Sequence, residues 1–369
     1  MADTDDDEGP KELGSYKMGK VLGAGAFSKV KLGTHMTSGL QVAVKIVDKE
    51  MIQNIKDLER VMREMHVLKN IIHPNIIRLH EVMEKGARLF LVLDFAGGGE
   101  LYDYVMDKGP LPEKQARTFF GQILSGVDFF HRQHVSHRDM KPENVLMVDN
   151  GNGALVCKIA DFGLSNDMVP GMALKTICGT PAYAAPEITL GQKYDGIAVD
   201  IWSTGVILFF LVAGQIPFDC ESQSELFKRI QNGTFSIPSH CSPELSDLIR
   251  RFMDVSPQKR ITTAQAWLHP WLSSLNNRFL DLDLDDVDDD LEDAIDKEGA
   301  DGDTGEKSVG EPGEGGGRFV NGVSFPTPTL ELLGNAAHLP PACTEAAVLD
   351  SNGVNFLIVA LSPASSKDG

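Results

Sequence analysis

Cysteine is scarce in this sequence, and its placement excludes several classes of protein. The 369 residues contain five cysteines, an odd number at wide spacing, and no two of them form a C-x-x-C pair. This pattern argues against a zinc site or a redox dithiol, and against the disulfide framework of a small secreted domain. We therefore expect a protein of a reducing compartment, cytoplasmic, nuclear or both.

Apolar runs long enough to cross a membrane are also absent. The longest aliphatic stretches, at residues 206–212 and 356–361, are much shorter than the roughly 20 residues that span a bilayer. The N-terminus, Met-Ala-Asp-Thr-Asp-Asp-Asp-Glu, has neither a cationic region nor an apolar run, so it does not read as a signal peptide. We expect a soluble protein that binds neither membranes nor nucleic acid.

Basic residues are too few to balance the acids, but only at the two ends of the chain. The formal net charge is −19, from 53 acids against 34 bases. Residues 1–14 carry six acids and one Lys, and residues 273–369 carry twenty acids and five bases, which leaves 27 acids and 28 bases between them. We predict a disordered acidic N-terminus at 1–15, a globular region at 16–272 and a disordered acidic, glycine-rich linker at 273–317. Residues 318–369 form a short C-terminal segment of unknown role, in which 354–361 predict one strand or short helix.

One short stretch, HRDMKPEN at residues 137–144, combines acidic, basic and amide side chains. Asp139 and Asn144 lie five residues apart on one predicted loop. A carboxylate there can accept a hydroxyl proton, and an amide oxygen can hold Mg²⁺ beside the same phosphate. A surface loop that caps a helix is the plainer interpretation, and the partners required elsewhere decide between the two.

A glycine-rich turn near the start of the globular region predicts a phosphate-binding loop. Residues 21–30 read as strand, turn, strand, in which Gly23 and Gly25 let backbone N–H groups approach phosphate oxygens closely. This motif is weak on its own, and a plain hairpin turn is the alternative.

A single Lys interrupts the apolar strand predicted at residues 42–46. Burying Lys45 is costly unless it meets an anionic partner, and Glu64, on a helix predicted over 60–69, can be that partner. The alternative is a Lys45 that alternates outward to solvent.

Two further strands end in residues that suit a nucleotide and a metal. The apolar strand at 89–96 breaks into three glycines, which suits a hinge where a flat base bonds to the backbone of Asp94 and Ala96. The strand at 156–160 delivers Asp161-Phe162-Gly163, where a carboxylate can hold Mg²⁺ between two phosphates. Asp200 lies on a strongly apolar helix and needs buried donors, which the backbone of the 137–144 loop can supply.

These residues occur in the order and spacing of the eukaryotic protein kinases, and residues 16–272 resemble one whole kinase domain. Lys141 and the Gly179-Thr180-Pro181 segment resemble serine/threonine kinases. Within the calcium/calmodulin-dependent group, the chain most resembles the AMP-activated and sucrose-non-fermenting kinases, although residues 25–30 look more like the calmodulin-regulated branch. The motifs that carry this resemblance are GGGEL (97–101), YAAPE (183–187), YDG (194–196), VDIW (199–202) and GVIL (205–208).

The resemblance implies an α+β, two-lobed fold, with a small β-rich lobe that has one main helix, a larger mainly helical lobe, and ATP and Mg²⁺ between them. It implies that Asp139 accepts the substrate proton, Lys141 neutralises the γ-phosphate, and Lys45, paired with Glu64, orients the other phosphates. Asn144 and Asp161 would hold Mg²⁺. The implied ATP-binding residues are Gly23, Gly25, Val30, Ala43, Lys45, Leu93 as gatekeeper, Asp94, Ala96 and Leu146. Leu68, Leu79, His137 and Phe162 resemble the apolar stack that links the lobes.

Regulation and substrate choice follow from the same resemblance. Thr176 lies where such kinases carry an activating phosphate from an upstream kinase, and Arg138 and Lys175 are its basic neighbours. Thr180 resembles a structural contact to the catalytic loop beside the peptide substrate. Glu100 and Glu143 would line the peptide groove and favour basic residues upstream of the target Ser or Thr, whereas solvated surface carboxylates are the alternative.

Two other classes of function remain to be weighed. A pseudokinase scaffold acting through its acidic tail would be signalled by loss of Lys45, Asp139 or Asp161, and all three are present. A small-molecule phosphotransferase on the same fold would not need the segments at 179–187 that serve peptides. The resemblance implies protein substrates and leaves regulatory subunits open.

Overall fold

The computed structural model describes residues 10–25, 28–52, 55–150, 153–167, 174, 180–275, 343–351 and 354–361. Thr176, residues 1–9 and all but the first three residues of the predicted 273–317 linker lie outside this set. The chain divides into two compact units, Met1–Gly305 and Glu306–Gly369. Each is described by itself.

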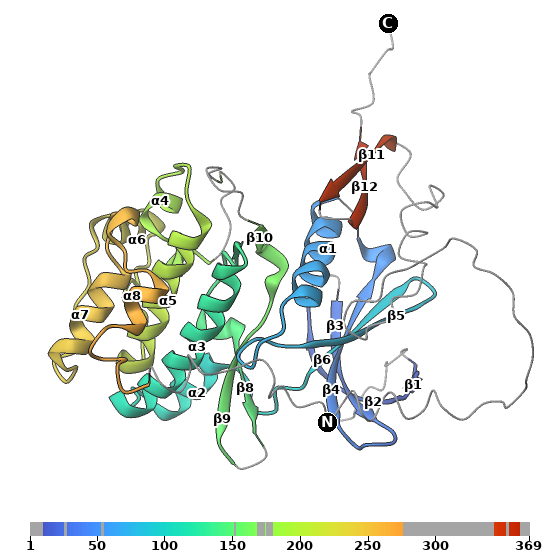
Figure 1. Cartoon of the computed structure of the whole chain (residues 1–369), viewed down its shortest axis with the longest axis horizontal. Coiled ribbons are helices and arrows are strands. Elements are labelled where there is room, and N and C mark those ends of the chain that lie inside the picture. Colours follow the sequence, from blue (N-terminus) through green and yellow to red (C-terminus); the bar gives the residue numbers. More distant parts are fainter. Residues whose placement is uncertain are drawn as a thin grey trace, which may run out of the picture. The chain divides into compact units, whose positions relative to one another are not determined.

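The first unit begins with a six-stranded antiparallel sheet (Figure 1). Its strand order is β1-β2-β3-β4-β6-β5, so each of the first three strands pairs with the next along the chain, and β6 pairs with both β4 and β5. The strands are β1 (Glu12–Leu13), β2 (Tyr16–Ala24), β3 (Ser28–His35), β4 (Gln41–Asp48), β5 (Leu79–Lys85) and β6 (Arg88–Asp94).

Alternation along the strands gives the two faces of this sheet different chemistry. A buried cluster on one face contains even-numbered residues of β4 and β6, together with Leu13 and Tyr16. The odd-numbered residues point to the other face, because successive side chains of a strand alternate. Residues directly opposite one another share a face, and Lys45 is paired with both Val30 and Leu91, while Ala43 is paired with Leu93. Four of the residues predicted to contact ATP therefore lie on one face.

One long helix, α1 (Ile55–Asn70), accompanies the sheet (Figure 1). It starts five residues earlier than the helix predicted at 60–69. Its buried residues include Val61, Val67, Leu68 and also Glu64, and the helix packs against the short 3-10 helix η3 (Phe162–Leu164). Because η3 follows Asp161, this packing joins the sheet lobe to the metal-binding segment predicted from the sequence.

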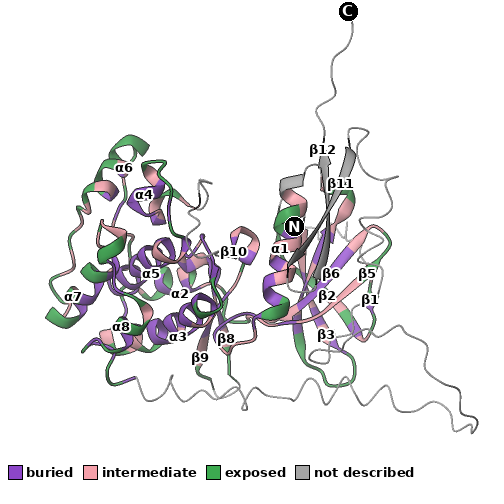
Figure 2. Ribbon diagram, turned by 45° about the horizontal axis from the view of Figure 1, so that its top comes forward, coloured by how far each residue is buried: buried purple, intermediate pink, exposed green. Residues whose placement is uncertain are grey.

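The rest of the first unit is mainly helical. Its helices are α2 (Leu101–Lys108), α3 (Glu113–Arg132), α4 (Pro186–Thr189), α5 (Gly196–Ala213), α6 (Gln223–Asn232), α7 (Pro243–Phe252) and α8 (Thr263–Trp267). Figure 2 shows buried residues running along α3 and α5, which form the core of this lobe. Together with the sheet lobe, this arrangement confirms the predicted α+β, two-lobed fold.

Helix α5 is long and apolar enough to cross a membrane by length and composition, yet 83% of it is buried inside the protein. That burial marks it as a core helix. It passes α7 so closely that a Cβ atom on Gly205 would lie 2.5 Å from the Cβ of Phe252. Only glycine fits at this crossing.

Four short strands connect the helices near the junction of the lobes. β8 (Val145–Asp149) pairs with β9 (Leu155–Ile159), and β7 (Val135–Ser136) pairs with β10 (Asn166–Asp167). The 3-10 helices η1 (Lys49–Met51), η2 (Pro142–Asn144), η4 (Pro181–Tyr183) and η5 (Pro257–Lys259) complete the unit.

The second unit contains a hairpin of β11 (Cys343–Ser351) and β12 (Val354–Leu361). Of the two predictions for 354–361, the strand is correct and the helix is wrong. Sequence reasoning missed β11, whose mixed composition hides it. The signal was present, because Asn352-Gly353 between the two strands is a typical two-residue hairpin turn sequence.

Candidate active site

Lys45 of β4 and Glu64 of α1 form the ion pair predicted from the sequence. Lys45 Nζ lies 2.6 Å from Glu64 Oε1 and 2.7 Å from Oε2. The pair is possible because β4 turns Lys45 toward the face on which α1 lies. Contact with both carboxylate oxygens fixes the ammonium group in place, and removing either partner would leave the other charge unpaired and largely buried.

The glycine-rich turn is open at one predicted position. A Cβ atom on Gly23 would meet nothing within 4 Å, and the Gly25 N–H donates to Ser28 O at 2.7 Å. Ala26 and Phe27, at the tip of the turn, lie outside the described residues. The open space over Gly23 suits the close approach of a phosphate group.

The side chain of Asp200 anchors the loop at 137–144. Its fully buried carboxylate accepts hydrogen bonds from the backbone N–H of His137 at 2.8 Å and of Arg138 at 2.7 Å. His131 Nε2 adds a third contact at 3.1 Å. The prediction that the loop backbone supplies the donors that Asp200 needs is confirmed.

The anchored loop contains a residue in the left-handed region. Arg138 has φ 65°, which is rare for a residue other than glycine and costs of order 1 kcal/mol. Two contacts of Arg138 hold it there: its N–H bonds to Asp200, and its Nε donates to Leu164 O at 2.6 Å. The strain lies immediately before Asp139, where function requires a fixed geometry.

Asp139, Lys141, Asn144 and Thr180 lie within hydrogen-bonding distance of one another. Lys141 Nζ is 2.8 Å from Asp139 Oδ2 and 3.2 Å from Thr180 Oγ1. The Thr180 N–H donates to Asp139 Oδ1 at 3.2 Å, so the predicted contact of Thr180 with the catalytic loop is confirmed. Asn144 Nδ2 donates to the Asp139 backbone O at 2.8 Å and to Oδ2 at 3.3 Å. Because Nδ2 makes these bonds, the amide oxygen is the atom that Asn144 can offer to a ligand.

Asp161 is exposed while its neighbour Phe162 is fully buried. Phe162 packs on the ring of His137 with a centroid distance of 4.7 Å and on Phe130 at 5.8 Å. Asp161 itself has φ 63°, so the chain reverses here and turns the carboxylate away from the buried ring. Leu68 and Leu79 are buried as well, so every residue of the predicted apolar stack is buried.

The hinge segment after β6 is hydrogen-bonded to β8 through its backbone. Gly98 N donates to Met147 O at 2.9 Å, Met147 N donates to Gly99 O at 2.8 Å, and Glu100 bridges to Leu146. This pairing places Leu146 beside the hinge. Within the described part of the chain, the N–H of Ala96 has no acceptor, which leaves it available to a flat base.

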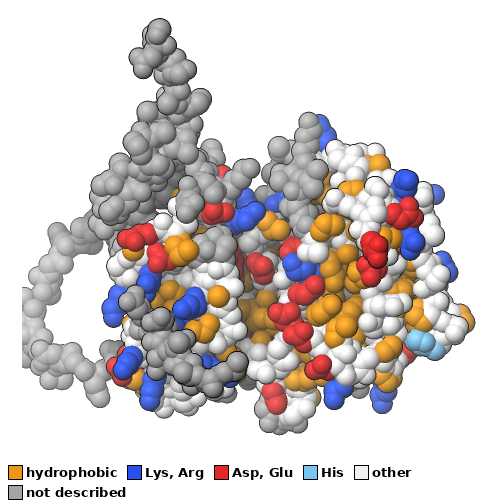
Figure 3. Space-filling model, turned by 180° about the vertical axis from the view of Figure 1, so that it is seen from behind, with side chains coloured by type: hydrophobic (Ala, Val, Ile, Leu, Met, Phe, Trp, Pro, Cys, Tyr) orange, Lys and Arg blue, Asp and Glu red, His pale blue; other side chains and the backbone are white. Residues whose placement is uncertain are grey.

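Two carboxylates, Glu100 and Glu143, share one environment near the helical-lobe wall. Burial, followed by the charges of Asp103 and Glu143, raises the pKa of Glu100. Glu143 Oε1 is 3.5 Å from the Tyr183 hydroxyl, whereas its Oε2 is buried without a hydrogen-bond partner among the described residues. Figure 3 shows acidic side chains gathered along the hollow between the lobes, beside an apolar surface. Neither Glu100 nor Glu143 is a fully solvated surface group.

This combination of a Lys–Glu pair, an anchored acidic loop and an exposed Asp beside a buried Phe is shared with a known domain. The profile of the protein kinase domain matches residues 16–272. The chain belongs to the protein kinase family.

Two relatives place this kinase within the family. The serine/threonine protein kinase OSK3 of Oryza sativa subsp. indica is 45% identical over 268 residues, which are 73% of this chain and 52% of OSK3. The SNF1-related protein kinase catalytic subunit alpha KIN12 of Arabidopsis thaliana is 44% identical over 277 residues, which are 75% of this chain and 55% of KIN12. The predicted resemblance to the sucrose-non-fermenting kinases is confirmed. The chain spans about half the length of these relatives.

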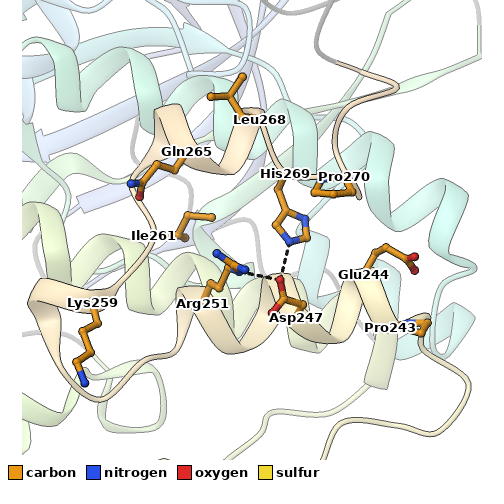
Figure 4. A pocket seen from close by; sticks show the side chains of 10 residues that line it. All are labelled: Pro243, Glu244, Asp247, Arg251, Lys259, Ile261, Gln265, Leu268, His269 and Pro270. Atoms are coloured by element: carbon orange, nitrogen blue, oxygen red, sulfur yellow. Dashed lines mark hydrogen bonds and ion pairs between the residues drawn. The ribbon is translucent and has the colours of Figure 1, made fainter.

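The kinase also has a cavity of about 650 Å³ on the helical lobe, away from the residues of the candidate site (Figure 4). Its wall includes Asp247 of α7, whose Oδ2 accepts from Arg251 Nε at 2.7 Å and from His269 Nε2 at 3.0 Å. These bonds lower the pKa of Asp247 against a small opposing effect of burial. The cluster is a local ion network, and among the described residues no group of three or more His, Cys, Asp or Glu side chains could hold a metal ion.

Sequence reasoning missed two charged groupings in the kinase. Arg260 forms a bidentate pair with Glu187, at 2.6 and 2.7 Å, in the interior of the helical lobe. At the hinge, the side chain of Asp94 contacts His80 and Lys158. Glu187 could have been flagged as an acid inside an apolar stretch, but nothing in the pattern distinguishes Lys158 from an ordinary exposed strand residue.

Proposed function

We propose that this chain is a protein serine/threonine kinase, which transfers the γ-phosphoryl group of ATP to hydroxyl groups of protein substrates. The geometry around Asp139 carries the proposal, because Lys141, Asn144 and the Thr180 N–H all lie within 3.3 Å of its carboxylate. That arrangement holds a base, a cation and an amide on one rigid loop. The names of the two relatives add support.

The residues divide the reaction between them. The Asp139 carboxylate accepts the proton of the substrate hydroxyl, and the Lys141 ammonium beside it stabilises the negative charge on the phosphoryl group in transfer. Lys45, fixed by Glu64, binds the phosphates that do not move. Phosphoryl transfer passes through a loose and highly charged transition state, so positioning and charge compensation supply most of the rate enhancement.

Asn144 and Asp161 fit a magnesium ion. Both present oxygen atoms, the ligands that Mg²⁺ prefers. Asn144 donates through its Nδ2 to Asp139, so its Oδ1 is the atom that it can offer to the ion. When bound, Mg²⁺ would neutralise the phosphate charge. On the adenine side, we assign the backbone of Asp94 and Ala96 to the base edge, Val30, Ala43 and Leu146 to its faces, and Leu93 to the gatekeeper position.

Substrates with basic residues upstream of the target Ser or Thr suit the groove. Glu143 Oε2 is a buried acceptor with no partner in the described chain, which an arginine or lysine of a bound peptide would satisfy. Glu100 adds a second negative charge close enough to influence the first. Replacing Glu143 with Gln should raise KM for an arginine-containing peptide about tenfold, which corresponds to roughly 1.4 kcal/mol, and leave a neutral peptide unaffected. Glu244→Gln, an exposed change on α7, is the control.

Activation by phosphorylation of Thr176 is part of the proposal. Thr176 lies outside the described residues, so its support is its position between Asp161 and Glu187 and the basic side chains of Arg138 and Lys175. A phosphate there would gain charge-assisted hydrogen bonds from these groups. The Thr176→Ala variant should remain at basal activity after treatment with an upstream kinase, while Thr234→Ala should respond like wild type. Full activation of Thr176→Ala would contradict the assignment.

Regulatory partners follow from the relatives by analogy. KIN12 is named a catalytic subunit, and we propose that this chain also works with regulatory subunits, in the cytoplasm or the nucleus. Loss of Lys45, Asp139 or Asp161 would signal the competing pseudokinase scaffold, and all three are present in the sequence.

The test of the main proposal is transfer of phosphate from Mg-ATP to serine peptides with and without an arginine three residues upstream. Wild type and Asp139→Asn are compared after treatment with an upstream kinase. Transfer to the arginine peptide that is lost in Asp139→Asn is the expected result. No transfer by the activated wild-type protein to either peptide would overturn the proposal.

A further inference from the structure

The first residue of the hinge is held by its side chain as well as by its backbone. Asp94 ends β6, and its Oδ1 lies 2.8 Å from His80 Nε2 of β5. Its Oδ2 accepts from Lys158 Nζ at 2.7 Å and from the Arg78 N–H at 3.1 Å. We call Asp94, His80 and Lys158 the hinge triad. The carboxylate thus contacts three groups from two segments, because Arg78 and His80 both lie where β5 begins and Lys158 lies on β9.

Lys158 brings this contact from the other lobe. It lies on β9, between residues that are tied to the segment after α1: Ile77 N donates to Ile159 O at 2.9 Å, and Ile159 N donates to Asn75 O at 2.8 Å. Strand β9 ends at Ile159, two residues before Asp161. This ion pair therefore adds to the backbone hydrogen bonds between the hinge and β8, and it links the hinge, where the adenine would bind, to the strand that precedes the proposed metal ligand Asp161.

The electrostatics of Asp94 show that this contact is strong. Burial of the carboxyl group opposes its ionisation, yet the hydrogen bond from His80 and the charge of Lys158 together hold its pKa well below its ordinary value. The side chains of Asp94 and Lys158 are only 17% and 18% exposed. A pair so shielded is screened by salt much less than a surface pair, and loss of one partner leaves a charge without compensation.

We propose that Lys158 is a positioning residue which, through Asp94, sets the distance between the ATP-binding hinge and Asp161. The inference rests on the proposed kinase function. The triad is present together with the intact Lys45–Glu64 pair and the buried Phe162, so it accompanies the assembled site. It therefore acts as a clamp that favours the assembled arrangement, and not as a brake that opposes it.

Removing the clamp should affect nucleotide binding more than the chemical step. Lys158→Met should raise KM for ATP about tenfold, because a displacement of the order of an ångström at the hinge misplaces the bound nucleotide. The turnover number kcat should change less, within about threefold, since Asp139 and Lys141 lie on a loop anchored separately by Asp200. The conservative Lys158→Arg should restore most of the affinity.

A double-mutant cycle tests whether the ion pair itself is responsible. Asp94→Asn keeps the backbone of the hinge and the size of the side chain but removes the charge. If the two residues act through one contact, the double variant should bind ATP as weakly as either single variant, because effects of paired residues do not add. If Lys158→Met does not fold, Asp94→Asn removes the ion pair in its place, and Lys158→Arg is the variant that keeps the charge. Arg229→Met, which breaks the exposed Arg229–Glu225 pair on α6, is the matched control.

The experiment measures KM for ATP and kcat with a saturating peptide, together with nucleotide affinity by equilibrium dialysis. Weaker nucleotide binding in Lys158→Met, little change in Arg229→Met and recovery in Lys158→Arg are expected. Unchanged nucleotide affinity in Lys158→Met would overturn the proposal. A rise in activity would overturn it as well, because it would show that the ion pair opposes the assembled site. Dialysis separates this outcome from failure of the proposed function, because nucleotide affinity is measured even if no peptide is phosphorylated.

Discussion

The catalytic loop and the interior of the helical lobe both hold charged side chains away from water, but they satisfy them differently. In the interior, Arg260 donates to both oxygens of Glu187, to Ala198 O and to Asp254 O, and its guanidinium lies 5.2 Å from the centre of the Trp202 ring. In the loop, Asp139 shares its carboxylate between Lys141, Asn144 and a backbone N–H at the edge of the hollow.

The two regions differ in how completely their charged groups are paired inside the protein. Every strong donor and acceptor of the Arg260–Glu187 pair has a partner inside the protein, so the pair can do nothing but hold α4 and α5 in place. The loop holds the Asp139 carboxylate through a cation, an amide and a backbone N–H at the edge of the hollow, and the Oδ1 atom of Asn144 can serve a ligand there. Charges that are fully paired in the interior stabilise the fold, and charges that are only partly paired at an edge are available for chemistry.

The largest expected effect is on activity and comes from the loop. Asp139→Asn keeps the shape of the side chain but removes the proton acceptor, so kcat should fall by about 10² to 10⁴-fold. The free energy of unfolding should change by less than about 1 kcal/mol, because the residue lies at an edge and keeps polar neighbours. Peptide phosphorylation and urea unfolding measure the two quantities. An Asp139→Asn enzyme within tenfold of wild type would show that the loop is structural.

In the interior of the helical lobe, we expect a large loss of stability and little change in activity. Arg260→Met leaves Glu187 buried and unpaired, which should lower the free energy of unfolding by about 3–5 kcal/mol. The double variant Arg260→Met, Glu187→Met should recover a large part of that loss, because no lone charge remains. Urea unfolding gives the comparison, and kcat per folded molecule should be near that of wild type. Equal stability of Arg260→Met and wild type would remove the distinction between the two regions.

The half-buried side chain of His73 extends the comparison to the effect of pH on stability. Burial, with a smaller effect of the Lys158 charge, lowers the pKa of His73 to about 4. The unfolded chain binds a proton at this residue near pH 6.5, so the native state loses stability as the pH falls from about 6.5 to about 4. Between pH 7 and pH 5 this should amount to about 2 kcal/mol.

His73→Gln is the variant that isolates this effect. It removes the titration while keeping a side chain that can accept from the Asn75 N–H, as His73 Nδ1 does at 3.1 Å. The difference in unfolding free energy between pH 7 and pH 5 should be smaller in the variant by that amount. An identical pH dependence in the two proteins would show that His73 titrates normally.

The smallest effect is expected at the surface network around Asp247. The carboxylate is 49% exposed, and solvent-exposed ion pairs contribute about 0.2–1 kcal/mol. Asp247→Asn should therefore lower stability by less than about 1 kcal/mol and leave peptide phosphorylation unchanged. Because the pKa of Asp247 is lowered in the folded protein, its contribution is present at neutral pH and is lost as the pH falls through that lowered pKa. A larger loss would mean that the cavity in Figure 4 depends on this carboxylate.

The parts of the site that were predictable from sequence are charges in places where charge is unusual. Lys45 interrupts a β-branched strand and Asp200 interrupts an apolar helix, and each needs a partner on energetic grounds alone. The structure supplies Glu64 to the first and the loop backbone to the second. The two-lobed fold was predictable in another way, because the resemblance of residues 16–272 to a whole kinase domain implies it.

Other features leave no local trace. Lys158 and Asp94 occupy alternating or terminal strand positions where a charged residue is ordinary, so their contact depends on tertiary placement alone. The left-handed backbone of Arg138 and Asp161 could not be predicted, because only glycine signals that conformation in a sequence. The earlier start of α1 reflects the weak signals at the ends of elements, whereas β11 was missed although the Asn352-Gly353 sequence signals a hairpin.

The carboxylate of Asp200 has a consequence for hydrogen exchange. The amide groups of His137 and Arg138 belong to no helix or strand, yet each donates to a side chain that is fully buried in α5. Loop amides normally exchange with solvent through small local fluctuations, whereas these two can exchange only when α5 and the loop separate. They should therefore exchange as slowly as core amides. Their exchange rates would then report how often the catalytic loop separates from α5.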